Sequence, residues 1–236
     1  QVSLKDLEVS RYSKTVRCMK VSEDDELVSV SSTDNPLEIM VVTRNAEVLR
    51  FRASEVALYG TNASGVKSIL VKPKDKVVDA FYTNQTEDIL FFTSRNYIKR
   101  MKVSEFALAR RARAGSIAIK MIKANPHYIV GAKPMTPMQY RENVNANLIY
   151  KNGNQIVDTY QFKYNLSDGG KAIEKDPLLN EAYMLFIDDA EGKEPIISGE
   201  YLLENKPTQT SIFDSSVDSA TFEDISTKSI LDDLDQ

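Results

Sequence analysis

The sequence predicts an all-β protein built from a repeated unit of about 50 residues, with about four strands in each unit. The first observation behind this prediction is an internal repeat. Sliding the chain by 50 positions aligns residues 39–58 with residues 89–108 without a gap, and seven of these twenty positions are identical. The same offset places Gly65 on Gly115 and "DDELVSV" under "KDKVVDA", and a weaker copy runs from "NANLIYKNGNQIVDTYQF" to a Gly-Gly pair.

The second observation is the pattern inside each unit. The runs "EIMVVT" and "DILFFT" are short, apolar and rich in β-branched and aromatic residues, and the turns "RNA" and "SRN" follow them. The next run alternates, which predicts that Phe51 and Met101 face one way and that the basic residues of the run face the other. These basic residues are Arg50, Arg52, Arg100 and Lys102.

About four strands per repeat of this length is typical of a propeller blade, and the alternative is a β-sandwich with a chance internal similarity. The repeat boundaries predict five segments along the chain. They are a partial first blade at residues 1–35, a blade at 36–86, a blade at 87–140, a divergent blade with closing strands at 141–207, and an acidic disordered tail at 208–236.

Composition narrows the class of protein. With 42% hydrophobic residues the chain can bury a core, and no run approaches 18 apolar residues. Cys18 is the only cysteine and cannot form an internal disulfide, so we expect a reducing compartment and a buried packing role for this side chain. No signal peptide opens the chain, which also favours a reducing cytoplasm. The first residue is Gln1 rather than Met and lies in what we expect to be a strand, so we interpret the chain as an N-terminally truncated fragment.

The charges are segregated along the chain. Residues 1–123 hold 21 Lys+Arg against 15 Asp+Glu, residues 124–208 hold 8 against 12, and residues 209–236 hold one lysine against seven acids. Residues 95–123 alone hold nine basic residues and one acid, Glu105. This asymmetry predicts a basic working surface followed by an acidic appendage, which either competes with DNA for the basic surface or only keeps the protein soluble.

A basic stripe of this kind can neutralise the phosphates of duplex DNA, and no recognition helix or RNA-binding aromatic signature accompanies it. We therefore predict contacts to the DNA backbone and shape, along one outer edge of a blade and its loop. The alternative is an ordinary solvated charged face. The predicted DNA-binding residues are Arg11, Lys14, Arg17, Arg50, Arg52, Lys67, Arg95, Lys99, Arg100, Lys102, Arg110, Arg111, Arg113 and Lys120.

The sequence offers no convincing catalytic constellation. Arg11-Tyr12 places a basic residue beside a tyrosine, a pair that could supply a nucleophile. It lies in an expected blade loop, so we do not assign it this role. His127 is the only histidine, which argues against a Ser-His triad or a histidine metal site, and we interpret it as the entry to a strand. No Walker-type phosphate loop is present. We expect no catalytic residue, metal or cofactor in this chain.

Several stretches carry a family resemblance. "GTNASGVKSI" resembles the G-x-x-A-x-G-V-[KR]-x-I element in the C-terminal domain of bacterial type IIA topoisomerase A subunits, and "TRNAEVLRFRASEV" resembles the strand pair before that element. "SRYSKTVRCMKV" is similar to a loop of topoisomerase IV A subunits from Gram-positive-type bacteria. The resemblance covers residues 1–140 well, 141–205 loosely and the tail not at all.

The resemblance implies a β-pinwheel, in which neighbouring blades exchange strands and DNA bends around a basic outer rim. It implies a role in the decatenation and relaxation of DNA by an ATP-hydrolysing topoisomerase IV, for which other domains and the B subunit supply ATP and Mg²⁺. An A2B2 heterotetramer would form through a missing N-terminal part. The implied location is the bacterial cytoplasm, on the chromosome, with peripheral membrane association left open.

Two alternatives stay open. The gyrase A subunit is marked by a Q-R-R-G-G-K-G box, and none of the four equivalent loops here, "SRYSKT", "YGTNASG", "ARRARAG" and "NLSDGG", contains it. A box outside this chain would restore the gyrase alternative, in which the domain wraps DNA for negative supercoiling. A propeller that binds protein partners without DNA is the alternative of another class, favoured by the acidic residues 124–208.

Overall fold

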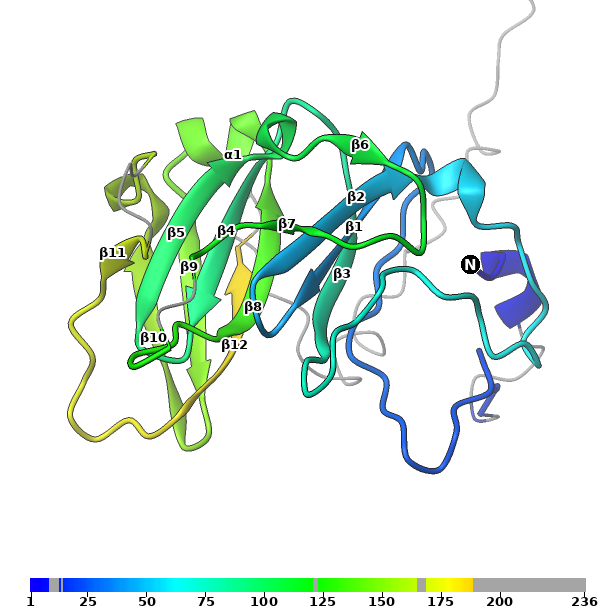
Figure 1. Ribbon diagram of the computed structural model, residues 1–236, viewed down its shortest axis with the longest axis horizontal. Helices are drawn as coiled ribbons and strands as arrows, with labels where there is room; N and C mark the ends of the chain where they lie inside the picture. The colour runs from blue at the N-terminus through cyan, green and yellow to red at the C-terminus, as the bar shows by residue number, and fades with distance from the viewer. Residues whose placement is uncertain (9–12, 14, 121–122, 165–168, 189–236) are drawn as a thin grey trace, which may run out of the picture. The chain divides into compact units, whose positions relative to one another are not determined.

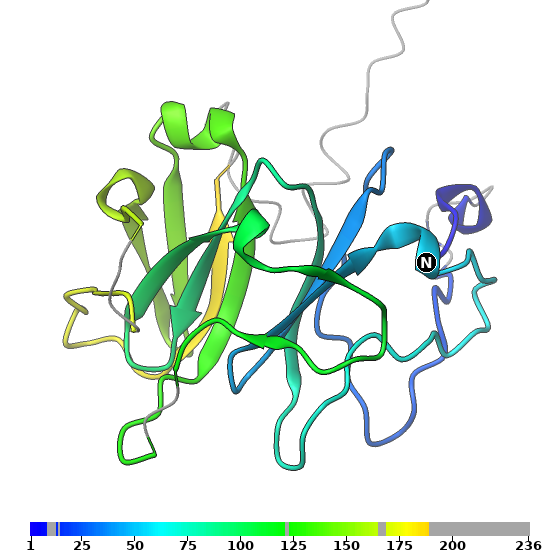
Figure 2. The ribbon, with the colours of Figure 1, turned by 45° about the horizontal axis from the view of Figure 1, so that its top comes forward.

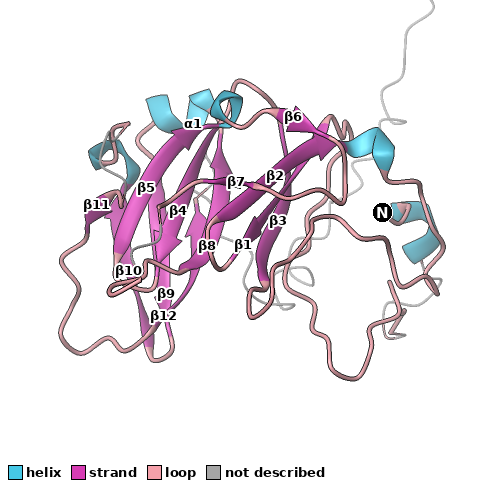
Figure 3. Ribbon diagram, in the orientation of Figure 1, coloured by secondary structure: helices cyan, strands magenta, loops and turns pink. Residues whose placement is uncertain are grey.

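Strands make up most of the regular secondary structure in the described part of the chain. The computed structural model describes residues 1–8, 13, 15–120, 123–164 and 169–188 (Figure 1). Its strands form three sheets, and loops with a few short helical turns join them (Figure 3). The helical elements are η1 (Leu4–Leu7), η2 (Ala53–Glu55), η3 (Val103–Glu105), α1 (Pro137–Arg141) and η4 (Thr159–Gln161).

Each sheet is built around a hairpin whose first strand also pairs with a later, third strand. The sheets have the orders β3-β1-β2-β6 with β7 also on β2, then β11-β5-β4-β8, and then β10-β9-β12. The strands of the first sheet are β1 (Glu38–Thr43), β2 (Glu47–Arg52), β3 (Val77–Thr83), β6 (Leu108–Ala109) and β7 (Ser116–Ile117). Those of the second are β4 (Asp88–Thr93), β5 (Tyr97–Lys102), β8 (Ile129–Met135) and β11 (Lys171–Ala172). Those of the third are β9 (Asn145–Tyr150), β10 (Gly153–Asp158) and β12 (Ala182–Ile187).

The predicted repeat is present in the hairpin register. Glu38 pairs with Arg52 across β1 and β2, and Asp88 pairs with Lys102 across β4 and β5, which is the same pairing 50 residues later. The two turns repeat as well, because Ala46 and Asn96 both have positive φ angles, of 65° and 59°.

Edge strands are exchanged between neighbouring sheets. β6 and β7 follow β5 in the chain but pair with β2, and β11 follows β10 but pairs with β5. Figure 2 lets the reader follow this crossing, in which the green segment after β5 returns to the blue hairpin. A glycine allows the backbones to approach closely at each crossing. A Cβ on Gly115 would lie 2.8 Å from the backbone nitrogen of Val48, and a Cβ on Gly170 would lie 2.5 Å from the carbonyl oxygen of Ile98. This exchange, together with the repeat, confirms the predicted pinwheel type of fold.

The core lies between the sheets and buries both faces of the hairpins. One cluster, which includes Met40, Phe91 and Phe106, joins the first sheet to the second, and another, which includes Phe92 and Leu148, joins the second to the third. β1 and β4 are consequently buried over almost their whole length. Strands covered on both faces need apolar residues at successive positions, which explains the continuous runs "EIMVVT" and "DILFFT".

The third strands lie close together at the inner side of the sheets. The Asp79 carboxylate of β3 accepts a hydrogen bond of 3.3 Å from the backbone nitrogen of Ala132 in β8 and lies 3.0 Å from Lys133. A Cβ on Gly131 would come within 2.7 Å of the backbone nitrogen of Leu185 in β12. Only glycine therefore permits the observed approach of β8 and β12.

Two expectations for the first segment are wrong, namely that a strand lies at Gln1 and that Cys18 is buried. No strand is assigned among the described residues before Glu38, although residues 27–33 align with β3. In the later units the third strand forms by pairing with the hairpin of its own unit. The described residues before Ser29 contain no such hairpin, so the segment around Ser29 has no strand with which to pair. Ser29 instead contacts β3, because its hydroxyl donates a 2.8 Å hydrogen bond to the carbonyl oxygen of Ala80. Cys18 is exposed rather than buried, as the extended segment around it covers no side of the core.

Candidate nucleic-acid interface

The structure separates the predicted DNA-binding residues into buried and exposed groups. Arg50 and Arg100 are 5% and 4% exposed, and Lys99 is 9% exposed. Arg52 and Lys102, at the ends of β2 and β5, are exposed, as are Arg17, Lys67, Arg95, Arg110, Arg113 and Lys120. Arg11 and Lys14 lie outside the described residues. That the exposed residues of this set contact DNA stays a prediction.

The buried arginines hold neighbouring sheets together. Arg50 pairs with Glu38 through contacts of 2.7 Å at Nε and 2.8 Å at Nη2, and its Nη1 donates a 2.9 Å hydrogen bond to the carbonyl oxygen of Phe106. Arg100 pairs with Asp88 in the same way, and its Nη1 donates to the carbonyl oxygen of Phe162 at 3.3 Å. Each arginine therefore links a hairpin to the turn that begins the next exchanged segment.

The prediction that Arg50, Lys99 and Arg100 contact DNA is wrong for this reason. Alternation correctly separates Arg50 from Phe51, but both faces of the hairpin are covered, so the opposite face is not solvent. Lys99 donates a 2.7 Å hydrogen bond from Nζ to the carbonyl oxygen of Ala118. A buried cation is costly unless it is paired or hydrogen-bonded, and these three are.

The electrostatics of Arg100 reflect this role. Desolvation by burial lowers the pKa of its guanidinium, but hydrogen bonds to Asp88 and Tyr140 and the charge of Asp88 outweigh it and leave the pKa above its ordinary value. The guanidinium lies 3.8 Å from the ring centroid of Tyr140 and 4.6 Å from that of Tyr164. Arg100 is therefore charged and fully engaged within the protein.

Burial of Lys99 and Arg100 interrupts the basic stripe that the sequence predicts along this edge. Arg95 lies at the turn between β4 and β5, whereas Lys102 lies at the other end of β5, roughly 20 Å away at the usual rise of a strand. Folding instead brings Arg52 together with Arg110, which lies 58 positions later, because β6 pairs with β2. These two arginines, Glu55, Leu108 and Ala109 line a shallow depression.

The loop after β6 contains two kinds of arginine. Arg110 and Arg113 are exposed, but Arg111 is half-buried and its Nη1 donates to the carbonyl oxygen of Lys67. The backbone nitrogen of Arg111 donates to the Glu55 carboxylate at 2.9 Å. Arg111 therefore orders the loop, while its neighbours point charges outward. We call Arg52, Lys67, Arg110 and Arg113 the basic loop surface.

Sequence reasoning missed a second group of cations, at the equivalent edge of the second sheet. The exchanged strand β11 pairs with β5, which Lys102 ends. This pairing brings Lys171, in β11, and Lys163, just before it in the chain, to the edge that holds Lys102. The repeat of 50 residues does not align these lysines with the preceding unit. The matching positions Phe106 and Phe162 are 56 residues apart, so the equivalence of the two edges was hidden in the sequence. The helix α1 lies within the segment that lengthens this unit.

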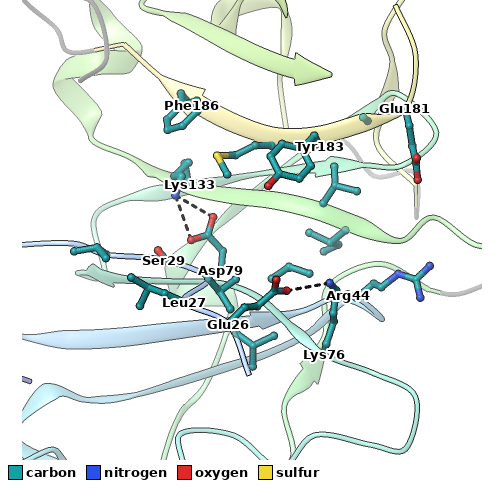
Figure 4. Close-up of a pocket in the computed structure, with 18 residues that line it drawn as sticks. Glu26, Leu27, Ser29, Arg44, Lys76, Asp79, Lys133, Glu181, Tyr183 and Phe186 are labelled. Carbon is teal, nitrogen blue, oxygen red and sulfur yellow. Dashed lines mark hydrogen bonds and ion pairs between the residues drawn. The ribbon is translucent and has the colours of Figure 1, made fainter. Parts of the chain in front are cut away.

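The described residues also line a cavity of about 450 Å³ where the third strands meet (Figure 4). Residues 26–30, β3, β8 and β12 all contribute to its wall. Its charges are paired within the protein, since Lys133 contacts Asp79 at 3.0 Å and Lys76 contacts Glu26 at 3.5 Å. A cavity with balanced charges favours no particular class of ligand.

Other chemistry is limited in the part of the chain that the structure describes. There, three or more His, Cys, Asp or Glu side chains nowhere gather as a metal site would require. Likewise, none of the described helices is long and apolar enough to cross a membrane. His127 lies just before β8, as predicted, and its ring packs edge-on against Tyr97 at 4.7 Å.

The repeated hairpins, the exchanged edge strands and the exposed cations beside them define a pinwheel-type repeat domain. The family model "DNA gyrase C-terminal domain, beta-propeller" matches residues 2–34, 37–84 and 87–134. The chain belongs to this family. The resemblance read from the sequence is confirmed at this level.

Curated relatives are named as the A subunit of DNA topoisomerase 4. The protein of that name from Bacillus subtilis (strain 168) is 37% identical over 120 residues, which is 51% of this chain and 15% of the relative. The one from Staphylococcus aureus is 35% identical over 167 residues, which is 65% of this chain and 21% of the relative. The chain thus spans about a fifth or less of the length of these relatives.

Solved structures agree with this relationship. The C-terminal domain of DNA topoisomerase IV superposes with a TM-score of 0.70 at 29% identity, covering 80% of this chain and 58% of that one. A DNA gyrase A C-terminal domain superposes with a TM-score of 0.64 at 15% identity, covering 75% and 59%, and that likeness shows the fold alone. The relatives and the structures together therefore support the topoisomerase IV A subunit better than the gyrase A subunit.

Proposed function

We propose that the chain is a DNA-binding and DNA-bending C-terminal domain of a topoisomerase IV A subunit. The observation that carries the proposal is the basic loop surface, where Arg52, Arg110 and Arg113 are exposed on an edge made by strand exchange. Such a surface can contact phosphates of either strand without reading bases, because each contact depends only on charge. The names of the curated relatives support the same proposal.

The proposal places the chemistry outside this chain. The intact enzyme would be an ATP-hydrolysing type IIA topoisomerase of the bacterial cytoplasm, associated with the chromosome, that decatenates replicated chromosomes and relaxes supercoils. ATP and Mg²⁺ would be used by other domains and by the B subunit in an A2B2 heterotetramer. This chain would contribute no catalytic residue, metal or cofactor, and would hold and bend the duplex on which the enzyme acts.

The test is the salt dependence of duplex binding by the 236-residue chain. Affinity should fall steeply with salt and be the same for unrelated sequences, with a logarithmic slope of about 0.9 for each phosphate neutralised. The double variant Arg110→Ala/Arg113→Ala should bind more weakly and lose about one unit of slope for each true contact. Lys5→Ala/Lys74→Gln, which removes two exposed lysines elsewhere, is the matched control.

The outcomes separate the competing functions. A slope and an affinity that are equal in the double variant and the control would exclude the basic loop surface as the DNA site. Absence of duplex binding at low salt would favour the propeller that binds protein partners. Chiral wrapping, measured as supercoils of one sign constrained in closed circular DNA, would favour the gyrase-type alternative over bending alone.

A further inference from the structure

A second surface at the edge of the second sheet differs in chemistry from the basic loop surface. We call Lys102, Tyr160, Lys163 and Tyr164 the tyrosine–lysine surface. Lys102 ends β5, Tyr160 lies in η4, and the other two follow η4 on the way to β11. The two tyrosines are 49% and 48% exposed, although tyrosine rings of this size are usually buried more fully.

The rings of this surface are held in place from below. The Tyr164 hydroxyl donates to the Asp88 carboxylate, with oxygen–oxygen distances of 2.7 and 2.9 Å. Tyr140 stacks on Tyr160 with 6.0 Å between ring centroids and 19° between ring planes, and Arg100 lies over both Tyr140 and Tyr164. Because Asp88 engages the Tyr164 hydroxyl, the exposed part of that side chain is its ring.

A lysine ammonium group lies over each of the two exposed rings. Lys102 Nζ is 4.9 Å from the ring centroid of Tyr164, and Lys163 Nζ is 6.0 Å from that of Tyr160. Three carboxylates nearby are engaged: Asp88 by Arg100, Asp158 by the backbone nitrogen of Tyr160 at 2.8 Å, and Glu105 by the backbone nitrogen of Lys102 at 2.9 Å. A base that stacks on either ring takes the place of the lysine ammonium group above it, and that group can then contact the adjoining phosphate. This combination of aromatic rings and lysines is the chemistry of single-strand recognition.

The equivalent edge of the first sheet lacks this chemistry. Phe106 and Phe162 occupy the same position, since each accepts a hydrogen bond from the buried arginine of the preceding hairpin. Counting from them, Ser104 stands where Tyr160 lies and Leu108 where Tyr164 lies. At these two positions the first edge has no aromatic ring, and its exposed arginines suit an intact duplex whose bases are stacked inside.

We propose that the tyrosine–lysine surface binds unpaired bases of single-stranded DNA. This inference goes beyond the duplex binding proposed above and does not require it, because different residues carry it. A base exposed by local opening of a duplex would stack on Tyr160 or Tyr164, and Lys102 and Lys163 would contact the adjoining phosphates. Duplex DNA would not use the rings, because its bases are already stacked on each other.

The test compares single-strand binding by ring-removing and ring-keeping variants of the whole chain. The probe is a fluorescein-labelled oligothymidylate of about 16 nucleotides, and an abasic oligomer of the same length supplies phosphates without bases. Tyr160→Ala should weaken oligothymidylate binding by about fivefold or more, the loss expected for one stacked base. Tyr160→Phe keeps the ring and should bind within about twofold of the parent chain.

Tyr183→Ala is the matched control, because Tyr183 is 59% exposed on β12, in the wall of the cavity. The proposal is overturned if Tyr160→Ala binds oligothymidylate as the parent does, if the abasic oligomer binds equally well, or if Tyr183→Ala loses as much affinity. Loss of oligothymidylate binding with unchanged duplex binding supports the proposal. Duplex binding that depends on Arg110 and Arg113 without any oligothymidylate binding rejects this inference alone. Oligothymidylate binding that depends on Tyr160, without any duplex binding, rejects only the proposed function.

Discussion

Arg50 of one repeat donates a 2.9 Å hydrogen bond to the carbonyl oxygen of Phe106 in the next, and Arg100 makes the equivalent contact with Phe162. The contact joins a hairpin to the turn from which the exchanged strand of the following unit departs. The arginine that sequence periodicity places on a DNA-facing edge thus has a structural role between sheets. This relationship separates residues that should affect stability from residues that should affect DNA binding.

Arg100→Ala should destabilise the protein strongly, by about 3–5 kcal/mol, because it leaves Asp88 buried without its partner. Lys102→Ala, two positions along the same strand, should change the free energy of unfolding by less than about 0.5 kcal/mol, because Lys102 is exposed. Urea denaturation of both variants measures the difference. A stable Arg100→Ala variant that only loses DNA affinity would restore Arg100 as a DNA contact.

Gly115→Ala should loosen the exchanged strand β7, because the added Cβ would lie within 2.9 Å of three backbone atoms of Val48. We expect a loss of about 1–3 kcal/mol, the usual range for an overpacked site, and faster amide hydrogen exchange in β2 and β7. Gly60→Ala is the control, since nothing lies within 4 Å of a Cβ there. Equal exchange rates in the two variants would contradict the predicted role of Gly115.

Stability should fall as the pH drops below about 6.5, partly through His127. Burial, and then the charge of Arg95, lower the pKa of His127 below its ordinary value of 6.5. The unfolded chain therefore takes up a proton at a higher pH than the folded protein does, so this contribution is present above the unfolded pKa and is lost on acidification. His127→Phe keeps a ring against Tyr97 and should show a weaker dependence of unfolding free energy between about pH 7.5 and 5.5. An unchanged dependence would rule out His127 as its source.

Removing the residues after Pro207 should raise the affinity for duplex DNA, most clearly at low salt. The removed segment includes the acidic tail, which lies outside the described residues and carries seven acids and one lysine over residues 209–236. A tethered anionic segment can compete with DNA at a high local concentration, and salt screens that competition. Identical titrations of the shortened and whole chains at low salt would leave the tail a solubilising role only.

The sequence by itself determined the repeat, the hairpins and their register. Ile39–Leu58 and Ile89–Leu108 share apolar runs and turn residues at equal spacing, and local strand and turn preferences act within such short segments. The repeat also aligned Gly65 with Gly115, and only a residue without a side chain fits where Gly115 meets Val48. The hairpins and their register depend on residues close together in the chain, and the glycine position depends only on the absence of a side chain.

Only the tertiary structure decided which cations face solvent. Arg50 and Arg52 occupy the same face of β2 by alternation, yet the next sheet covers Arg50 and leaves Arg52 exposed. Arg110 and Arg111 are adjacent in the chain, but Arg111 turns toward the carbonyl oxygen of Lys67. Packing between sheets and the exchange of edge strands set these outcomes, and both join residues about 50 positions apart, beyond the reach of any local pattern.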